Sequence, residues 1–275
     1  MKLPVKVLCE KVGMSRQNFY KSRRDRQRQV VDEGLVKQLV EAERAVQPRI
    51  GGLKLHALLC PELEAAGLSI GRDRFFEVLR RQGLLLEPLP RAPRTTNSRH
   101  SLPVFTNLIK DIKPTGANQI WVSDITYIRT REAFVYLSLI TDMHSHKIVG
   151  YHLGRTLEIE DTLKALDMAL AQTPDGASPI HHSDRGCQYC SHEYVKRLRE
   201  RGVSISMTEE NHCAENAMAE RVNGILKQEY FLKHEFRNME QARRAVNEAV
   251  YLYNTRRPHR SLNLRTPEQV HGMAA

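Results

Sequence analysis

Long apolar runs, a secretion signal and a set of cysteines suited to disulfides are all missing from this 275-residue chain. No stretch of about 18 consecutive apolar residues occurs, so no transmembrane helix is expected. The first residues, MKLPVKVLCEK, lack the apolar segment of a signal peptide. Five cysteines, an odd number, fit reduced thiols better than a disulfide framework. These absences predict a cytoplasmic protein that does not enter a membrane.

An equal balance of acidic and basic residues is lacking in the first third of the chain. Residues 1–100 hold 20 Lys and Arg against 11 Asp and Glu, whereas the remaining 175 residues hold 22 against 21. The net charge of +10 is therefore concentrated at the N-terminal end. A basic block of this kind most often faces a polyanion, and nucleic acid is the commonest. A solvated surface without a partner is the alternative that charge alone leaves open.

The basic third has helical patterns broken by glycine. Residues 5–24 resemble a helix-turn-helix, with Ser15 placed to cap the second helix. Residues 53–69 and 71–86 form a second such pair, although similar pairs are common in proteins that never meet DNA. We expect a helix-turn-helix at 1–30, a second helix-turn-helix-like domain at 31–86, and a basic proline-rich linker at 87–117.

The rest of the chain changes to β-branched and aromatic segments followed by helices. Strands are expected at 118–130, 131–144, 146–156, 178–183 and 203–207, and helices at 157–172, 191–201 and from 214 onward. This order predicts a mixed five-stranded α/β fold at 118–255, preceded by an all-α region and followed by a basic tail at 256–275.

Two aspartates stand at unusual places in the predicted sheet. Asp124 lies in the middle of a strand that is apolar on both faces, where an ionised carboxylate is costly unless it is paired or binds a cation. Asp184 ends the fourth strand, just before Gly186. A hydrogen-bonded structural aspartate and an ordinary turn aspartate are the respective alternatives.

The helix expected over residues 214–230 offers a third carboxylate. Glu220 falls opposite the apolar stripe of this helix, in a polar row with Asn216, Asn223 and Lys227, whereas Glu215 falls on the stripe side. The row fits a surface that meets a polar ligand, and it also fits plain solvent exposure.

The three acids and their flanks resemble a known family. WVSDITYI, HHSDRGCQY and AENAMAERVNG place Asp124, Asp184 and Glu220 as in the DDE transposases and retroviral integrases, and 35 residues separate the last two acids, counted as 220 − 184 − 1. The closing YNTRRPHRSLNLRTPEQV resembles the C-terminal segment of second-frame (OrfB) transposases of the IS3 group of bacterial insertion sequences. The similarity extends from about residue 35 to residue 272.

The resemblance implies a ribonuclease-H-like fold and a catalytic role for the three carboxylates. They would bind two Mg²⁺ or Mn²⁺ ions, which are hard cations suited to oxygen ligands. The implied activity is metal-dependent cleavage of double-stranded DNA at the element ends, followed by strand transfer into target DNA. Such members act as homo-oligomers on DNA, and some are fused to an upstream OrfA-type product.

The resemblance and the charge pattern also suggest residues that contact DNA: Arg16, Gln17, Asn18, Arg72, Arg74, Arg185, Asn216, Asn223, Lys227, Arg256, Arg257, His259 and Arg260.

Three alternatives remain at this point. Cys187 and Cys190, with histidines nearby, suggest a zinc site, which is disfavoured because it would lie beside a magnesium site. The chain could also be a catalytically inactive DNA-binding regulator, or a ribonuclease-H-type nuclease that cleaves without joining.

Overall fold

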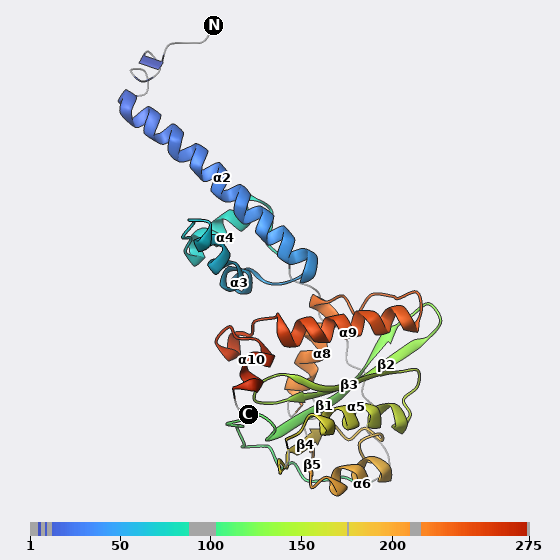
Figure 1. The fold of residues 1–275 in the computed structure, drawn as a ribbon. Helices are drawn as coiled ribbons and strands as arrows, with labels where there is room; N and C mark the ends of the chain where they lie inside the picture. The colour runs from blue at the N-terminus through green and yellow to red at the C-terminus, as the bar shows by residue number, and fades with distance from the viewer. Residues whose placement is uncertain are drawn as a thin grey trace. The chain divides into compact units, whose positions relative to one another are not determined.

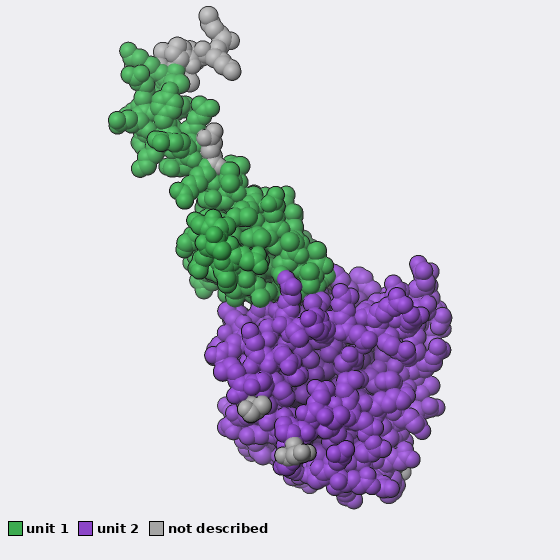
Figure 2. Space-filling view, viewed as in Figure 1, with its two compact units in different colours: residues 1–87 green, residues 88–275 purple. Residues whose placement is uncertain are grey.

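The chain forms two compact units, residues 1–87 and 88–275, shown in different colours in Figure 2. The computed structural model describes residues 5–6, 9, 13–87, 103–174, 176–209 and 216–273. Residues 88–102, about half of the expected linker, lie outside this description. Within it, no helix is both long and apolar enough to cross a membrane.

The first unit is helical, with α2 (Arg16–Val46), α3 (Gly52–Ala65) and α4 (Arg72–Arg81) around a small apolar core. Ser15 caps α2 as expected, because its Oγ accepts a hydrogen bond from the backbone N of Asn18 at 3.2 Å. The helix then continues through residue 30, where a domain boundary was expected. It contains no proline, and its single interior Gly34 costs only about 1 kcal/mol relative to alanine. Most of the helix expected before Ser15 falls outside the described residues.

The second unit contains the predicted five-stranded mixed sheet, in the order β3-β2-β1-β4-β5. Its strands are β1 (Ile120–Arg129), β2 (Phe134–Asp142), β3 (Ile148–Gly154), β4 (Ile180–Ser183) and β5 (Ser204–Met207). The first three strands pair antiparallel, whereas β4 pairs parallel to both β1 and β5. The ribonuclease-H-like topology expected from the sequence is confirmed.

Helices cover both faces of this sheet (Figure 1). On one face, α5 (Ile159–Ala171) and α6 (His192–Glu200) share a core with the fully buried Trp121. On the other, α8 (Ala217–Glu229) and α9 (Met239–Thr255) pack against Ile128 and Leu139. Both faces of β1 are therefore covered, which explains its near-continuous apolar sequence.

The last residues are folded rather than forming an extended tail. A short 3-10 helix (Arg260–Leu262) and α10 (Pro267–Gly272) follow α9. Thr266 starts α10 with a capping box, in which its hydroxyl accepts from the backbone of Gln269 and the Gln269 side chain bonds back to the Thr266 N–H. The C-terminal segment is thus folded as part of the second unit.

Gly150 in β3 allows α5 to approach the sheet closely. A Cβ at this position would collide with the carbonyl oxygen of Ala165 and lie 2.9 Å from the Cβ of Ala169. We expect Gly150→Ala to lower the free energy of unfolding by about 1–3 kcal/mol, because a packed backbone cannot move aside cheaply. Gly224→Ala in α8, where a Cβ meets nothing within 4 Å, should stabilise the fold by about 0.5–1 kcal/mol. Urea denaturation of both variants tests this, and similar stability changes in both would contradict the packing argument.

Candidate active site

The parallel pairing of β1 with β4 brings two of the expected carboxylates together. Ladder partners run from Ile120 with Ile180 to Ser123 with Ser183, and the pairing stops there. The next residue along the chain is an aspartate in both segments: Asp124, which is still in β1, and Asp184, which directly follows β4. Because neighbouring parallel strands lie about 4.8 Å apart, the two aspartates start from adjacent backbone positions at the point where the strands separate.

The chain turns sharply after Asp184. The backbone N of Gly186 donates to Asp184 Oδ1 at 3.0 Å, and a Cβ on Gly186 would lie 3.0 Å from the same oxygen. A glycine at this position therefore lets the backbone come close to the carboxylate without crowding it.

Asp124 is held in a fixed orientation by two hydrogen bonds. Its Oδ2 accepts from Asn223 Nδ2 at 2.7 Å, and its Oδ1 accepts from the backbone N of Ile125 at 2.9 Å. At the N-terminal end of α8, Asn216 Nδ2 donates to the carbonyl oxygen of Ser123 at 2.9 Å. These two asparagines attach α8 to β1 immediately beside the carboxylate.

This attachment corrects the DNA-contact assignments of Asn216 and Asn223. Both side chains are buried, and they bond β1 instead of lining an outer surface. The polar row of α8 was expected to point away from the sheet. Asn216 and Asn223 instead face β1, whereas Glu220 of the same row is exposed. The pairing of β4 ends at Ser123, which leaves that edge of β1 for α8 to cover.

The three carboxylates influence one another electrostatically. Burial, and then the negative charge of Asp184, raises the pKa of Asp124 to about 7, with a smaller contribution from Glu220. The hydrogen bonds from Asn223 and Ile125 act in the opposite direction and lower this pKa. The Asp124 side chain is partly accessible to solvent, although protein atoms surround it. The free energy needed to ionise it is therefore lower than for a fully buried carboxyl group.

Glu220 lies in the first turn of α8 with an exposed side chain. Among the described residues, no three His, Cys, Asp or Glu side chains already stand at ligand spacing. The donor set fits Mg²⁺ or Mn²⁺, because it consists of carboxylate oxygens whose mutual repulsion, seen at Asp124, a cation would relieve. Glu215 lies outside the described residues.

The zinc alternative gains no support from the described part of the chain. Cys190 is buried, with its Sγ 3.7 Å from Met207 Sδ, whereas Cys187 is exposed. His182 is also buried, and its Nδ1 lies 2.8 Å from Ser206 Oγ. His212 and Cys213 lie outside the described residues.

A buried polar group under the two aspartates was not anticipated from the sequence. His181 Nε2 lies 2.7 Å from Ser123 Oγ and 3.0 Å from the hydroxyl of Tyr194. Burial lowers the pKa of His181 to about 3, so its ring is neutral and adds no positive charge beneath the carboxylates. A histidine in a short strand leading to an aspartate was the only sequence signal, and it does not identify the partners.

The expected DNA-contact residues differ in their surroundings. Arg16, Gln17 and Asn18 are exposed at the start of α2, and Arg256 and Arg260 are exposed near the C-terminus. Several others already have partners within the protein: Arg72 with Asp73 at 2.9 Å, Arg74 with Glu77 at 2.9 Å, Arg185 Nε with the Thr208 carbonyl oxygen at 2.7 Å, and Lys227 Nζ at 4.2 Å from the Tyr127 ring. Contact of these residues with DNA stays a prediction.

The structure assigns Arg257 and His259 to the protein interior, which corrects their expected role at the DNA. Arg257 forms a bidentate ion pair with Glu229 at the end of α8, with N–O distances of 2.8 and 2.7 Å. Its Nη1 lies 2.9 Å from His259 Nε2. Arg257 is 3% exposed and His259 is 5% exposed, so neither presents a surface to a ligand.

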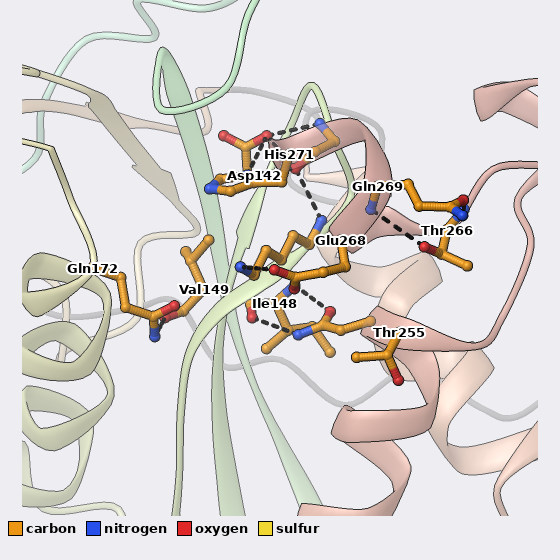
Figure 3. Close-up of polar contacts among 12 residues, drawn as sticks. Asp142, Ile148, Val149, Gln172, Thr255, Thr266, Glu268, Gln269 and His271 are labelled. Carbon is orange, nitrogen blue, oxygen red and sulfur yellow. Dashed lines mark hydrogen bonds and ion pairs between the residues drawn. The ribbon is translucent and has the colours of Figure 1, made fainter. Parts of the chain in front are cut away.

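The helix α10 lies beside the end of β2. Figure 3 shows Glu268 and His271 of α10 near Asp142, the last residue of β2. Asp142 is fully buried, and its oxygens accept from the backbone N of Ser145 at 2.7 Å and of Asn118 at 2.8 Å. Although burial raises its pKa, hydrogen bonds from His271, Ser145 and Asn118 hold the pKa of Asp142 below its ordinary value. This aspartate fastens loops and the C-terminus.

Comparison with known proteins agrees with this geometry. Two models, each described as an integrase core domain, match residues 114–213 and 201–267. The Shigella sonnei "Insertion element IS600 uncharacterized 31 kDa protein" is 34% identical over 98% of this chain and 100% of its own length. Transposase InsF for insertion sequence IS3A of Escherichia coli (strain K12) is 33% identical over 77% of this chain and 74% of its own length. The chain belongs to the IS3-family transposases.

The fold of this transposase is also similar to that of a viral integrase assembly. A chain in the simian T-cell lymphotropic virus intasome, solved with a PP2A regulatory subunit, superposes with a TM-score of 0.50. It is 18% identical, and the match covers 80% of the transposase and 74% of that chain. At this identity the likeness concerns the fold alone.

The two adjacent arginines Arg256 and Arg257 should behave differently when truncated. We expect Arg257→Met to lower the free energy of unfolding by about 3–5 kcal/mol, because it leaves the Glu229 carboxylate without its cation in a largely buried place. Arg256→Met, at an exposed position, should change stability by less than about 0.5 kcal/mol. Urea denaturation of the two variants tests this, and a small effect for Arg257→Met would show that the buried pair contributes little.

Asp124 should make stability depend on pH in the metal-free protein. Its pKa is about 7 in the folded state against an ordinary value of 3.8, so the folded state keeps a proton that the unfolded state loses. Stability therefore falls as pH rises through this range, by at most about 1.4 kcal/mol per pH unit. Asp124→Asn should stabilise the protein at about pH 8, by roughly 2 kcal/mol given its partial solvent access, and should have little effect near pH 4.

Asp142→Asn is the matched control, because the pKa of Asp142 is shifted downward. Its ionised form contributes stability above the ordinary value of 3.8 and loses it as pH falls, so this variant should be destabilised at about pH 8. Denaturation curves with a chelator present measure both variants. A loss of stability in Asp124→Asn at the higher pH would contradict the electrostatic account.

Proposed function

We propose that this transposase binds the ends of its insertion sequence and catalyses metal-dependent DNA cleavage and strand transfer as a DDE polynucleotidyl transferase. The observation that carries the proposal is the junction of Asp124 and Asp184, where β1 and β4 separate. Asp124, whose pKa is raised by burial and by the neighbouring Asp184, and a third carboxylate on an exposed helix turn suit binding of divalent cations better than a purely structural role.

Asp124, Asp184 and Glu220 would hold two Mg²⁺ or Mn²⁺ ions, which activate an attacking oxygen and stabilise the leaving oxygen of a phosphodiester. The protein contributes orientation. Asn223 fixes the Asp124 carboxylate, and the turn at Gly186 sets the direction of Asp184. The attack would come first from water and then from the freed 3′-hydroxyl of the DNA.

The basic N-terminal third would supply most of the affinity for DNA. Positive charge concentrated in residues 1–100 suits contacts with phosphates, which position a duplex without reading its sequence. The exposed Arg16, Gln17 and Asn18 on the first turn of α2 would read base edges at the element end. The active form would be a homo-oligomer on DNA, as the intasome origin of the similar solved chain suggests, with an upstream OrfA-type product as a further partner.

Strand transfer on a labelled duplex that carries the element end and its flank tests this proposal, with Mg²⁺ or Mn²⁺ present. We expect the unaltered protein to give joined products, and Asp184→Asn and Glu220→Gln to lose roughly 100-fold or more of the cleavage rate. Glu215→Gln should keep most of the activity, because spacing and helix face select Glu220.

Other outcomes identify the rival functions. Cleavage without joining would indicate the nuclease. Binding without chemistry would indicate the inactive regulator or a chain that requires its upstream partner. Equal losses from Glu215→Gln and Glu220→Gln would overturn the assignment of the third carboxylate.

A further inference from the structure

Two aromatic side chains lie exposed and in contact on the β1–β2 hairpin. The rings of Tyr127 and Phe134 are 5.4 Å apart between centroids and meet edge to face, at an interplanar angle of 78°. Tyr127 is 42% exposed and Phe134 is 48% exposed, although aromatic residues of this size are usually well buried. Neither belongs to a core cluster of the sheet, so their contribution to folding is small.

This aromatic pair lies close to the carboxylates. Lys227 Nζ sits 4.2 Å from the centre of the Tyr127 ring. The same lysine feels the charge of Asp124, which raises its pKa, although burial lowers it more. Lys227 thus contacts one ring of the pair and also feels the charge of Asp124, and Tyr127 follows Asp124 by three residues on β1.

Charged side chains of both signs lie on the hairpin near the pair: Arg129 is the ladder partner of Phe134, and Arg131 and Glu132 stand between the two strands. Arg129 and Arg131 both approach one carboxylate, Glu235, at 3.2 and 3.8 Å. Their side chains are 65% and 71% exposed, so solvent screens these ion pairs and both guanidinium groups remain accessible. Exposed rings bordered by cations are typical of surfaces that bind single-stranded nucleic acid.

We propose that Tyr127 and Phe134 form a stacking platform for an unpaired base of the DNA strand that separates at the active site. This inference rests on the proposed function and extends it to the form of DNA that the site prefers. A ring at the platform would stack on the base, and Lys227 together with Arg129 would face the adjoining phosphates. Stacking accepts any base, because every base has a π face, so the platform would act without regard to sequence.

A nucleic acid suits this surface better than a protein partner does. Protein interfaces place aromatic residues in a centre depleted of charge, whereas here Lys227 contacts the Tyr127 ring and the exposed Arg129 is the ladder partner of Phe134. The edge-to-face arrangement also leaves ring surface open to a third planar group.

The test compares two DNA probes of one sequence with the full-length protein. One is a blunt duplex, and the other carries a short thymine tail on one strand that ends in the fluorescent base 2-aminopurine. We expect the protein to bind the tailed duplex at least about fivefold more tightly and to quench the fluorophore by stacking. Substituting both rings, Tyr127→Leu with Phe134→Leu, should remove the preference and the quenching while binding of the blunt duplex stays unchanged.

Two control variants separate stacking from general effects. Phe134→Tyr keeps a π face and should retain the preference for the tailed probe. Tyr251→Leu removes a ring that is 65% exposed on α9, away from the hairpin, and should also retain it. Equal binding of both probes by the unaltered protein, or a full preference in the double variant, would overturn the platform and leave the proposed transposase function intact. Failure to bind either probe would count against both proposals.

Discussion

The geometry of the candidate active site depends on one short parallel pairing. Four residues of β1 pair with four residues of β4, and this ladder places Asp124 beside Asp184. The backbone pairing alone sets this position, so no direct bond between the two side chains is required. Because the register of a parallel pair is set by backbone hydrogen bonds, a slip of one residue would turn one aspartate to the opposite face of the sheet. The apolar residues of β1, buried on both faces, fix that register.

The end of this ladder also determines how α8 is attached. Beyond Ser123 the edge of β1 has no strand neighbour on the β4 side, and α8 covers it through Asn216 and Asn223. At the other end of α8, Glu229 is tied to the C-terminal segment by Arg257. The helix that carries Glu220 is therefore anchored at both ends, while the glutamate itself stays exposed and able to move.

The site stores electrostatic repulsion that a cation would release. A carboxylate whose pKa is raised to about 7 by burial and by its acidic neighbour costs stability when ionised. The neutral His181 below does not relieve this cost, because burial keeps it unprotonated. Lys227 feels the charge of Asp124 and also contacts the Tyr127 ring, which links the site to the aromatic pair of the hairpin.

The sequence by itself determined the elements that follow from local pattern: five strands, the Ser15 cap, a strand aspartate in an apolar run, and the spacing of 35 residues between Asp184 and Glu220. It could not decide which polar side chains face inward. Arg256 and Arg257 are adjacent and chemically identical, and only the distant Glu229 makes one of them a buried anchor. The inward position of Asn223 likewise depends on the edge of β1 that β4 leaves open. Its partner there, Asp124, lies almost a hundred residues earlier in the chain. Helical periodicity describes one segment at a time, whereas burial of a polar group depends on the partner that tertiary folding brings to it.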